Sequence, residues 1–181
     1  ALADAYNNRA HYYLRKDSLD NAFNDSSMAI RLRPDKSQYY GTRGEAYLRK
    51  GEYEKAIVDL NRAISANQQH PSLYLNRGIA FDKQGQFRKA IQDYNTAALL
   101  SPNSADIYIR RGILYGKQKQ HENALQDFTT AISLEPTNVY GYLNRGTVYK
   151  LKGMRAAALA DFRKACSLGE KAACDLARNA F

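Results

Sequence analysis

A period of 34 residues constrains this sequence more than any other feature. Gly44, Gly78, Gly112 and Gly146 follow one another at intervals of 34 residues, and Ala10 occupies the equivalent place one interval earlier. A regular period of about 20 to 50 residues is typical of proteins built by stacking copies of one small structural unit. We therefore expect five copies of such a unit in the chain.

Aromatic and small residues recur at fixed positions of this repeat. Counted from residues 3, 37, 71, 105 and 139, position 4 is always tyrosine, position 11 is always aromatic, and positions 20 and 27 are always alanine. Small residues are expected at such fixed positions where helices touch. The columns are Tyr6, Tyr40, Tyr74, Tyr108 and Tyr142; Tyr13, Tyr47, Phe81, Tyr115 and Tyr149; Ala22, Ala56, Ala90, Ala124 and Ala158; and Ala29, Ala63, Ala97, Ala131 and Ala165.

Each copy has the pattern of two helices joined by a turn. In the third copy, residues that suit a helix interface are spaced by three or four at Tyr74, Gly78 and Phe81 and again over 90–97, with a break around Gly85. This spacing places them on one face of each helix. Proline cannot continue a helix, because it lacks the N–H group and clashes with the preceding turn. The prolines expected at the ends of second helices are Pro34, Pro102 and Pro136, whereas Pro71 is expected to open a first helix.

A helix-turn-helix unit of 34 residues with small residues at positions 8, 20 and 27, aromatic residues at 4 and 11 and proline near 32 resembles the tetratricopeptide repeat (TPR) family. The resemblance covers residues 3–168 and implies an all-α fold, a right-handed superhelical solenoid of helical hairpins. Modest departures occur at Ser26, Gln68 and Gly169. The predicted units are 3–36, 37–70, 71–104, 105–138 and 139–168, followed over 170–181 by a capping helix with Ala173, Leu176, Ala177 and Ala180 on one face.

Two charged columns accompany the repeat, because position 7 is arginine and position 23 is aspartate in every copy. In an antiparallel hairpin that turns near position 15, these positions lie at nearly the same height, so we expect ion pairs. A column of arginines could instead bind phosphate, but each arginine has its own aspartate, which favours pairing. The columns are Arg9, Arg43, Arg77, Arg111 and Arg145, and Asp25, Asp59, Asp93, Asp127 and Asp161.

The net charge of +9 has another source, since the paired columns cancel. Basic residues recur at positions 13 and 14, where the helix dipole favours a cation by about 0.3 to 1 kcal/mol. The predicted basic edge consists of Arg15, Arg49, Lys83 and Lys117. Such an edge would attract acidic partners. Nucleic acid is a weaker alternative, because the sequence has no recognition motif for it and its aromatic residues belong to the hairpin core.

No arrangement of residues indicates catalysis. His11, His70 and His121 fall at positions 9, 34 and 17 of different copies, and we expect that they do not share a site. The sequence has no glycine-rich phosphate loop, no histidine pair spaced as metal ligands and no nucleophile elbow. We therefore predict a protein that is not an enzyme and has no metal or cofactor. No apolar run reaches the roughly 18 residues of a membrane-spanning helix, which predicts a soluble chain.

The TPR resemblance also implies a binding surface. In that family the first helices line a concave groove, where positions 5, 6 and 9 are exposed. Asparagine at position 6 can donate to and accept from a peptide backbone, and apolar residues at positions 5 and 9 would form a floor. Burial by curvature of the superhelix, or by a neighbouring molecule, is the alternative for the apolar positions. The predicted peptide groove comprises Asn8, Leu75, Asn76, Ile79, Ile109, Arg110, Ile113, Leu143 and Asn144.

The two cysteines, Cys166 and Cys174, lie on either side of the last predicted turn. Their spacing resembles that of TPR-like repeats in secreted bacterial proteins, where such a pair bridges the two helices of a hairpin. Two reduced, half-buried cysteines are the equal alternative. A disulfide would favour an exported protein, and otherwise the compartment stays open between cytoplasm and export.

These features together predict a scaffold that binds a peptide segment of a partner protein in the concave groove. The partner is a protein or peptide, with acidic character if the basic edge takes part. A self-assembling structural module is the first alternative, since the ends or concave faces of an open solenoid can pair with copies of themselves. An RNA-binding helical repeat is the third interpretation.

Overall fold

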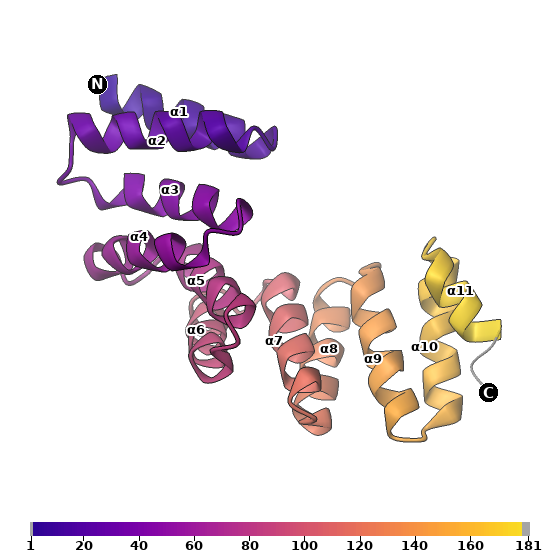
Figure 1. Cartoon of the computed structure of the whole chain (residues 1–181). Helices are drawn as coiled ribbons and strands as arrows, with labels where there is room; N and C mark the ends of the chain where they lie inside the picture. Colours follow the sequence, from indigo (N-terminus) through magenta and orange to yellow (C-terminus); the bar gives the residue numbers. More distant parts are fainter. Residues whose placement is uncertain (1, 179–181) are drawn as a thin grey trace. The chain divides into compact units, whose positions relative to one another are not determined.

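The computed structural model describes residues 2–178, and within this range every regular element is an α-helix (Figure 1). The helices are α1 (Leu2–Arg15), α2 (Leu19–Leu32), α3 (Ser37–Arg49), α4 (Tyr53–Ala66), α5 (Pro71–Lys83), α6 (Phe87–Leu100), α7 (Ala105–Lys117), α8 (His121–Leu134), α9 (Val139–Leu151), α10 (Arg155–Ser167) and α11 (Lys171–Arg178). The predicted all-α class and the alternation of first and second helices are confirmed.

The chain divides into two compact units. Unit 1 runs to Leu100 and contains α1 to α6, and unit 2 starts at Ser101 and contains α7 to α11. In unit 1 the pairs α1–α2, α3–α4 and α5–α6 form hairpins, and α2 and α4 also contact the first helix of the next hairpin. Unit 2 repeats this arrangement with α7–α8 and α9–α10.

The hairpin core depends on a close approach at position 8. A Cβ atom on Gly78 would lie 2.7 Å from Cε1 of Tyr94, and one on Gly112 would lie 2.8 Å from Cε1 of Phe128. Contacts this short do not occur between real side chains, so the aromatic ring of the second helix fills the place that a side chain would take. The alanines of positions 20 and 27 are at most 1% exposed. The expectation that small residues mark helix contacts is confirmed.

All five predicted Arg–Asp pairs are present. Arg77 donates from Nε and Nη2 to Oδ2 and Oδ1 of Asp93 at 2.8 and 2.7 Å, and its guanidinium lies 5.6 Å from the ring centre of Tyr74. The hydrogen bond that Arg77 donates to Asp93 raises the pKa of Arg77. Because Asp93 is buried, its charge needs this partner. These columns are structural, which leaves no row of free arginines to hold phosphate.

The turn inside each hairpin needs one residue with left-handed backbone. Gly51, Gly85 and Gly153 fill position 15 with φ of 79°, 73° and 72°. Asp17 and Lys119 hold the same position with φ of 56° and 59°, a conformation that residues with a side chain adopt rarely. This single position reverses the chain between first and second helices.

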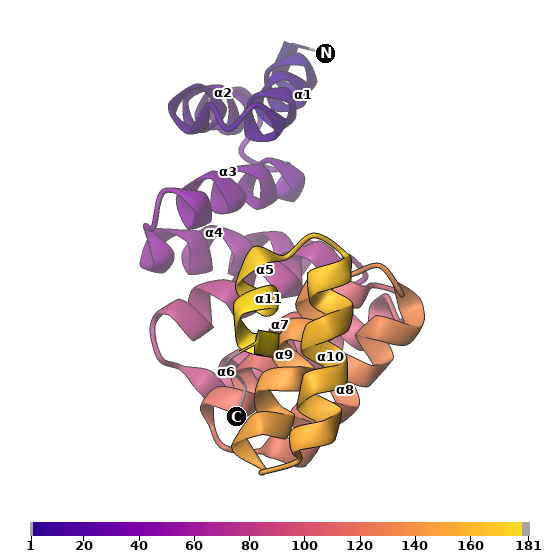
Figure 2. The same cartoon turned by 90° about the vertical axis from the view of Figure 1, so that its right-hand side faces the viewer.

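Unit 2 ends in the short helix α11, which lies beside α10 (Figure 2). Leu176 and Ala177 pack against the core around Phe162, and Ala173 is fully buried. Ala180, predicted on the same face, lies outside the described residues. Cys166 and Cys174 are joined by a disulfide with their Cα atoms 4.7 Å apart, so α11 is held to α10 covalently as well as by packing. None of the described helices has the length and apolar character to cross a membrane.

Candidate functional site

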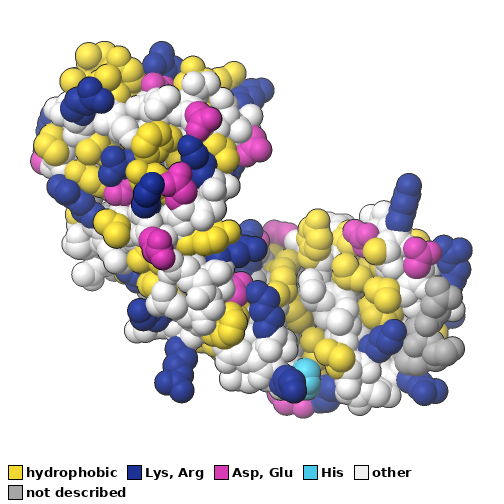
Figure 3. Space-filling view, viewed as in Figure 1, with side chains coloured by type: hydrophobic (Ala, Val, Ile, Leu, Met, Phe, Trp, Pro, Cys, Tyr) yellow, Lys and Arg dark blue, Asp and Glu magenta, His cyan; other side chains and the backbone are white. Residues whose placement is uncertain are grey.

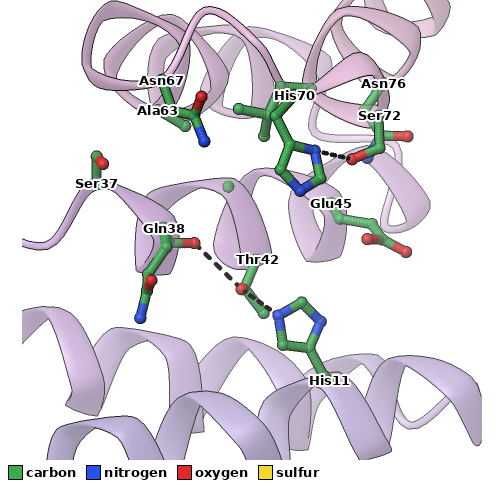
Figure 4. Close-up of a pocket in the computed structure, with 12 residues that line it drawn as sticks. His11, Ser37, Gln38, Thr42, Glu45, Ala63, Asn67, His70, Ser72 and Asn76 are labelled. Atoms are coloured by element: carbon green, nitrogen blue, oxygen red, sulfur yellow. Dashed lines mark hydrogen bonds between the residues drawn. The ribbon is translucent and has the colours of Figure 1, made fainter. Parts of the chain in front are cut away.

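The first helices of unit 1 line a cavity of about 210 Å³ (Figure 4). Helix α1 contributes one residue, α3 five, α4 one and α5 three, and the other two lie in the turn between α4 and α5. The lining residues are His11, Ser37, Gln38, Gly41, Thr42, Glu45, Ala63, Asn67, His70, Ser72, Leu73 and Asn76. We call this space the unit 1 cavity.

Gly41 is one of the lining residues and allows a neighbouring side chain to come close to the backbone of α3. It holds position 5 of its repeat, where the three later copies have leucine or isoleucine. A Cβ atom on Gly41 would lie 2.9 Å from Cδ2 of Leu73 and 3.7 Å from Cβ of Ala63. Without a side chain at this place, Leu73 and Ala63 approach the backbone of α3 and give the cavity an apolar wall.

A chain of hydrogen bonds orders one side of the cavity. The Thr42 hydroxyl lies 3.3 Å from the carbonyl oxygen of Gln38, one turn back, and 3.1 Å from Nε2 of His11. Both hydrogen bonds can form together when the hydroxyl donates its one proton to the carbonyl and accepts from Nε2 of His11. In that arrangement Nδ1 of His11 is left as an acceptor.

Glu45 supplies the one carboxylate among the lining residues. Its Oε1 accepts a hydrogen bond from Nη2 of Arg49 at 2.8 Å, one turn later in α3. Arg49 also donates from Nη1 to the carbonyl oxygen of Leu14 at 2.8 Å. Arg49 is thus held by α1 as well as by Glu45, and it is not itself among the lining residues.

Two of the three histidines lie at this cavity, which corrects the expectation that they do not share a site. Figure 4 shows His11 and His70 approaching from opposite sides, with Thr42 and Glu45 between them. Comparing positions within one repeat misses this, because the first helices of successive hairpins lie side by side. Only His121 is separate, at the start of α8 in unit 2. Among the described residues, no group of three or more His, Cys, Asp or Glu is arranged to hold a metal ion.

The corresponding face of unit 2 is filled instead of hollow. Ile109, at position 5, is 7% exposed and packs with Ala105 and Ala131. Leu143, the next residue in this column, is half-buried against the core around Phe162. The expectation that Ile109 offers an open apolar floor is wrong, because its side chain is part of the core. Ile113 is half-buried and contacts the same core.

The polar residues predicted beside this floor have partners on their own helices. Nε of Arg110 donates to Oδ2 of Asp106 at 2.8 Å. Nδ2 of Asn144 donates to the carbonyl oxygen of Tyr140 at 2.8 Å. Each side chain is therefore hydrogen-bonded to the turn that precedes it on its own helix.

Four predicted groove residues belong to unit 1. Asn76 is among the residues that line the unit 1 cavity, whereas the lining does not include Asn8, Leu75 or Ile79. Asn8 is exposed on α1, and Leu75 and Ile79 are half-buried on α5. Asn76 is therefore the point at which the predicted groove and the observed cavity coincide.

The predicted basic edge is divided between the units. Arg15, Arg49 and Lys83 lie in the last turns of α1, α3 and α5, and Lys117 lies in the last turn of α7. On the face shown in Figure 3, Lys and Arg side chains are dispersed through each unit rather than gathered in one patch. Arg49 is already hydrogen-bonded to Glu45 and to the carbonyl oxygen of Leu14. The positions of the four basic residues agree with a role in stabilising the C-terminal ends of their helices.

Sequence comparison decides the family. Models described as "TPR repeat" match residues 44–85 and 80–119, and models described as "Tetratricopeptide repeat" match residues 105–138 and 139–170. The chain belongs to the tetratricopeptide repeat family. TPR proteins are in general non-catalytic scaffolds, and this fold supports a role in protein interaction. No curated protein sequence matches the chain significantly.

Solved TPR structures share the fold. MamA from Desulfovibrio magneticus RS-1 is 20% identical with a TM-score of 0.82, covering 93% of this chain and 97% of its own. YrrB, described as a TPR protein with an unusual peptide-binding site, is 22% identical with a TM-score of 0.77, and the coverage is 96% and 90%. PilF from Pseudomonas aeruginosa is 16% identical with a TM-score of 0.85, and the coverage is 94% and 78%. At these identities the likeness shows the fold alone.

Most residues of the unit 1 cavity were not predicted, because apolar residues on the face of the first helices do not mark it. The signal was an interruption of the columns. Position 5 changes from leucine or isoleucine to Gly41, and position 9 changes from isoleucine to Glu45. In a repeat protein, such departures from the apolar residues of a column indicate a face that differs from the other copies.

Proposed function

We propose that this TPR protein is a non-catalytic scaffold that binds an extended peptide segment of a partner protein at the unit 1 cavity. The cavity carries the proposal, because it combines an apolar wall with polar groups that hairpin packing does not require. Asn76 has a donor and an acceptor for a peptide backbone. Leu73 and Ala63 offer apolar contact beside it.

The size of the cavity supports a peptide rather than a cofactor. Pockets for drug-sized ligands have volumes of about 300 to 1,000 Å³. A cavity of about 150 Å³ accepts a molecule the size of benzene. The unit 1 cavity, at about 210 Å³, has room for one side chain of a bound segment while the backbone of that segment stays at the rim.

The direct test is selection of peptides followed by titration. A displayed library of random dodecapeptides is selected on the intact chain, and the dissociation constants of the selected peptides are measured by fluorescence anisotropy. The test variant is His11→Ala with Asn76→Ala, which removes polar groups from the cavity at helical positions that accept alanine. Loss of two central contacts should weaken binding by about tenfold or more.

Unit 2 supplies the matched control. Asn144→Ala with Thr147→Ala changes the same two repeat positions, 6 and 9, on the first helix of a hairpin in unit 2. We expect unchanged affinity for this control at unchanged helicity. A loss confined to the control, or a library from which no binder emerges, would refute the proposal. Light scattering that rises with concentration in the absence of peptide would move the self-assembly alternative to first place.

A further inference from the structure

We infer that the side chain received by the unit 1 cavity is cationic, an arginine or lysine of the bound segment, and that Glu45 is its counter-charge. The inference rests on the proposed function and specifies the chemistry of its ligand. A cationic ligand differs from the acidic partner that the basic edge predicts, because the cavity is lined by a carboxylate whereas the edge consists of arginine and lysine. The contacts of the lining residues carry the argument.

Charge is the first of these observations. Glu45 is the one carboxylate among the lining residues, and its partner Arg49, which is not among them, is shared with the carboxylate of Asp17. The net charge of +9 opposes a cation at long range, but interactions between exposed charges are screened beyond about 8 Å at physiological salt. The charges close to the cavity therefore matter most, and there the two carboxylates of Glu45 and Asp17 share the one guanidinium of Arg49.

The uncharged groups add acceptors. Nδ1 of His11 carries a lone pair once Nε2 donates to Thr42, and Asn76 offers Oδ1. A guanidinium group has five N–H donors in a rigid plane and no acceptor, so it needs a site rich in acceptors. Together with the carboxylate of Glu45, these acceptors suit a cationic head group. A ligand that carries a carboxylate would find few donors here and would be repelled by Glu45.

The shape of the cavity suits the stem of the same side chain. Leu73 and Ala63 pack beside Gly41 and form the apolar wall. The long methylene stems of arginine and lysine pack on apolar surface while the charged head reaches polar groups. A shorter cation would leave this wall uncovered, and an aromatic side chain would leave Glu45 without a partner.

The test uses peptide pools that differ at one position. Acetylated and amidated pentapeptides carry a fixed central residue between mixed flanking residues, and the central residue is arginine, its uncharged analogue citrulline, or glutamate. Binding to the intact chain is followed by NMR through the backbone amides of Gly41 and Thr42. We expect the arginine pool to bind about tenfold more tightly than the citrulline pool, and the glutamate pool to bind most weakly.

Glu45→Gln should remove the preference for arginine over citrulline while both pools still bind. Asp106→Asn is the matched control, because Asp106 is also the carboxylate of a pair with an arginine four residues later, but in unit 2. Equal binding of the arginine and citrulline pools to the unmodified chain, tighter binding of the glutamate pool, or a preference that survives Glu45→Gln would overturn the inference while leaving peptide binding intact. Absence of binding by any pool would refute the proposed function itself.

Discussion

Gly41 in unit 1 and Ile109 in unit 2 occupy the same position of the same repeat, and the faces around them differ. Around Gly41 the first helices leave a cavity bordered by polar side chains, whereas Ile109 closes the equivalent place and becomes core. The hairpins behind the two faces are alike, with the same Arg–Asp pairs and the same glycine contacts at position 8. Residues that the hairpin does not require therefore decide where a TPR surface is open.

The largest effect on stability is expected from truncating the buried side chain at position 5 in unit 2. Ile109→Ala should lower the free energy of unfolding by about 2 to 4 kcal/mol, because it removes a buried side chain and leaves a cavity. Urea denaturation of the variant measures this loss. Val58→Ala is the control, since Val58 is exposed and its change should stay within about 0.5 kcal/mol. Equal midpoints for Ile109→Ala and the unmodified protein would mean that unit 2 is as open as unit 1.

A second substitution tests the hairpin core that both units share. Gly112→Leu should cost about 1 to 3 kcal/mol, because the new side chain would collide with Phe128. Gly116→Leu, one turn later in α7, meets open space and should not destabilise the protein. Gly78→Leu should behave like Gly112→Leu, because Tyr94 takes the place of Phe128. A clearly different loss of stability for Gly78→Leu and Gly112→Leu would show that the hairpin cores of the two units are not equivalent.

The ion pairs allow a finer comparison. A double-mutant cycle on Arg77 and Asp93 should give a coupling of about 1 to 3 kcal/mol, and the cycle on Arg111 and Asp127 should give a similar value. Both arginine side chains are less than one fifth exposed. Arg9, paired with Asp25, is 54% exposed, so its cycle should give a smaller coupling. Additive losses at Arg77 and Asp93 would show that the columns do not contribute as pairs.

The smallest effect concerns a contact found in unit 1. The Tyr39 hydroxyl donates to Oδ1 of Asp4 at 2.6 Å and, as the main cause, lowers the pKa of Asp4 to about 2. At a pH above the ordinary pKa of aspartate, this contact contributes fully to the stability of the fold. The contribution is lost as the pH falls through about 2. Tyr39→Phe should move the pKa of Asp4 upward toward 3.8, as measured by NMR titration of the carboxyl carbon. An unmoved pKa would assign the shift to other groups.

Much of the fold could be predicted from the sequence because the repeat averages out local uncertainty. Five aligned copies identified the close approach at Gly112 and the pairing of Arg77 with Asp93, and both depend on contacts inside one hairpin. The two-unit division of the chain had no signal in the columns. The periodicity of the sequence describes a hairpin and its neighbours. The division into two units depends instead on where few contacts join successive parts of the chain, which the repeat does not encode.

The site was harder to predict, because it depends on what three hairpins leave unfilled. Asn76 was anticipated from its position in the repeat, but His70 lies in a turn and reaches the cavity only through the stacking of α5 on α3. Ile109 was predicted as part of an open floor, but its side chain is buried in the core. An apolar residue at this repeat position can be needed to close the core. The disulfide between Cys166 and Cys174 was left open by the sequence and is present in the structure.

The central claim is that unit 1 holds the open peptide site and that the equivalent face of unit 2 is packing. NMR mapping of a selected dodecapeptide onto the intact chain tests it most directly, because every backbone amide reports in one experiment. The account predicts shifts concentrated at His11, Gly41, Thr42 and Asn76, with Ile109 and Leu143 unmoved. Shifts concentrated at Ile109, Ile113 and Leu143, or of similar size in both units, would contradict it.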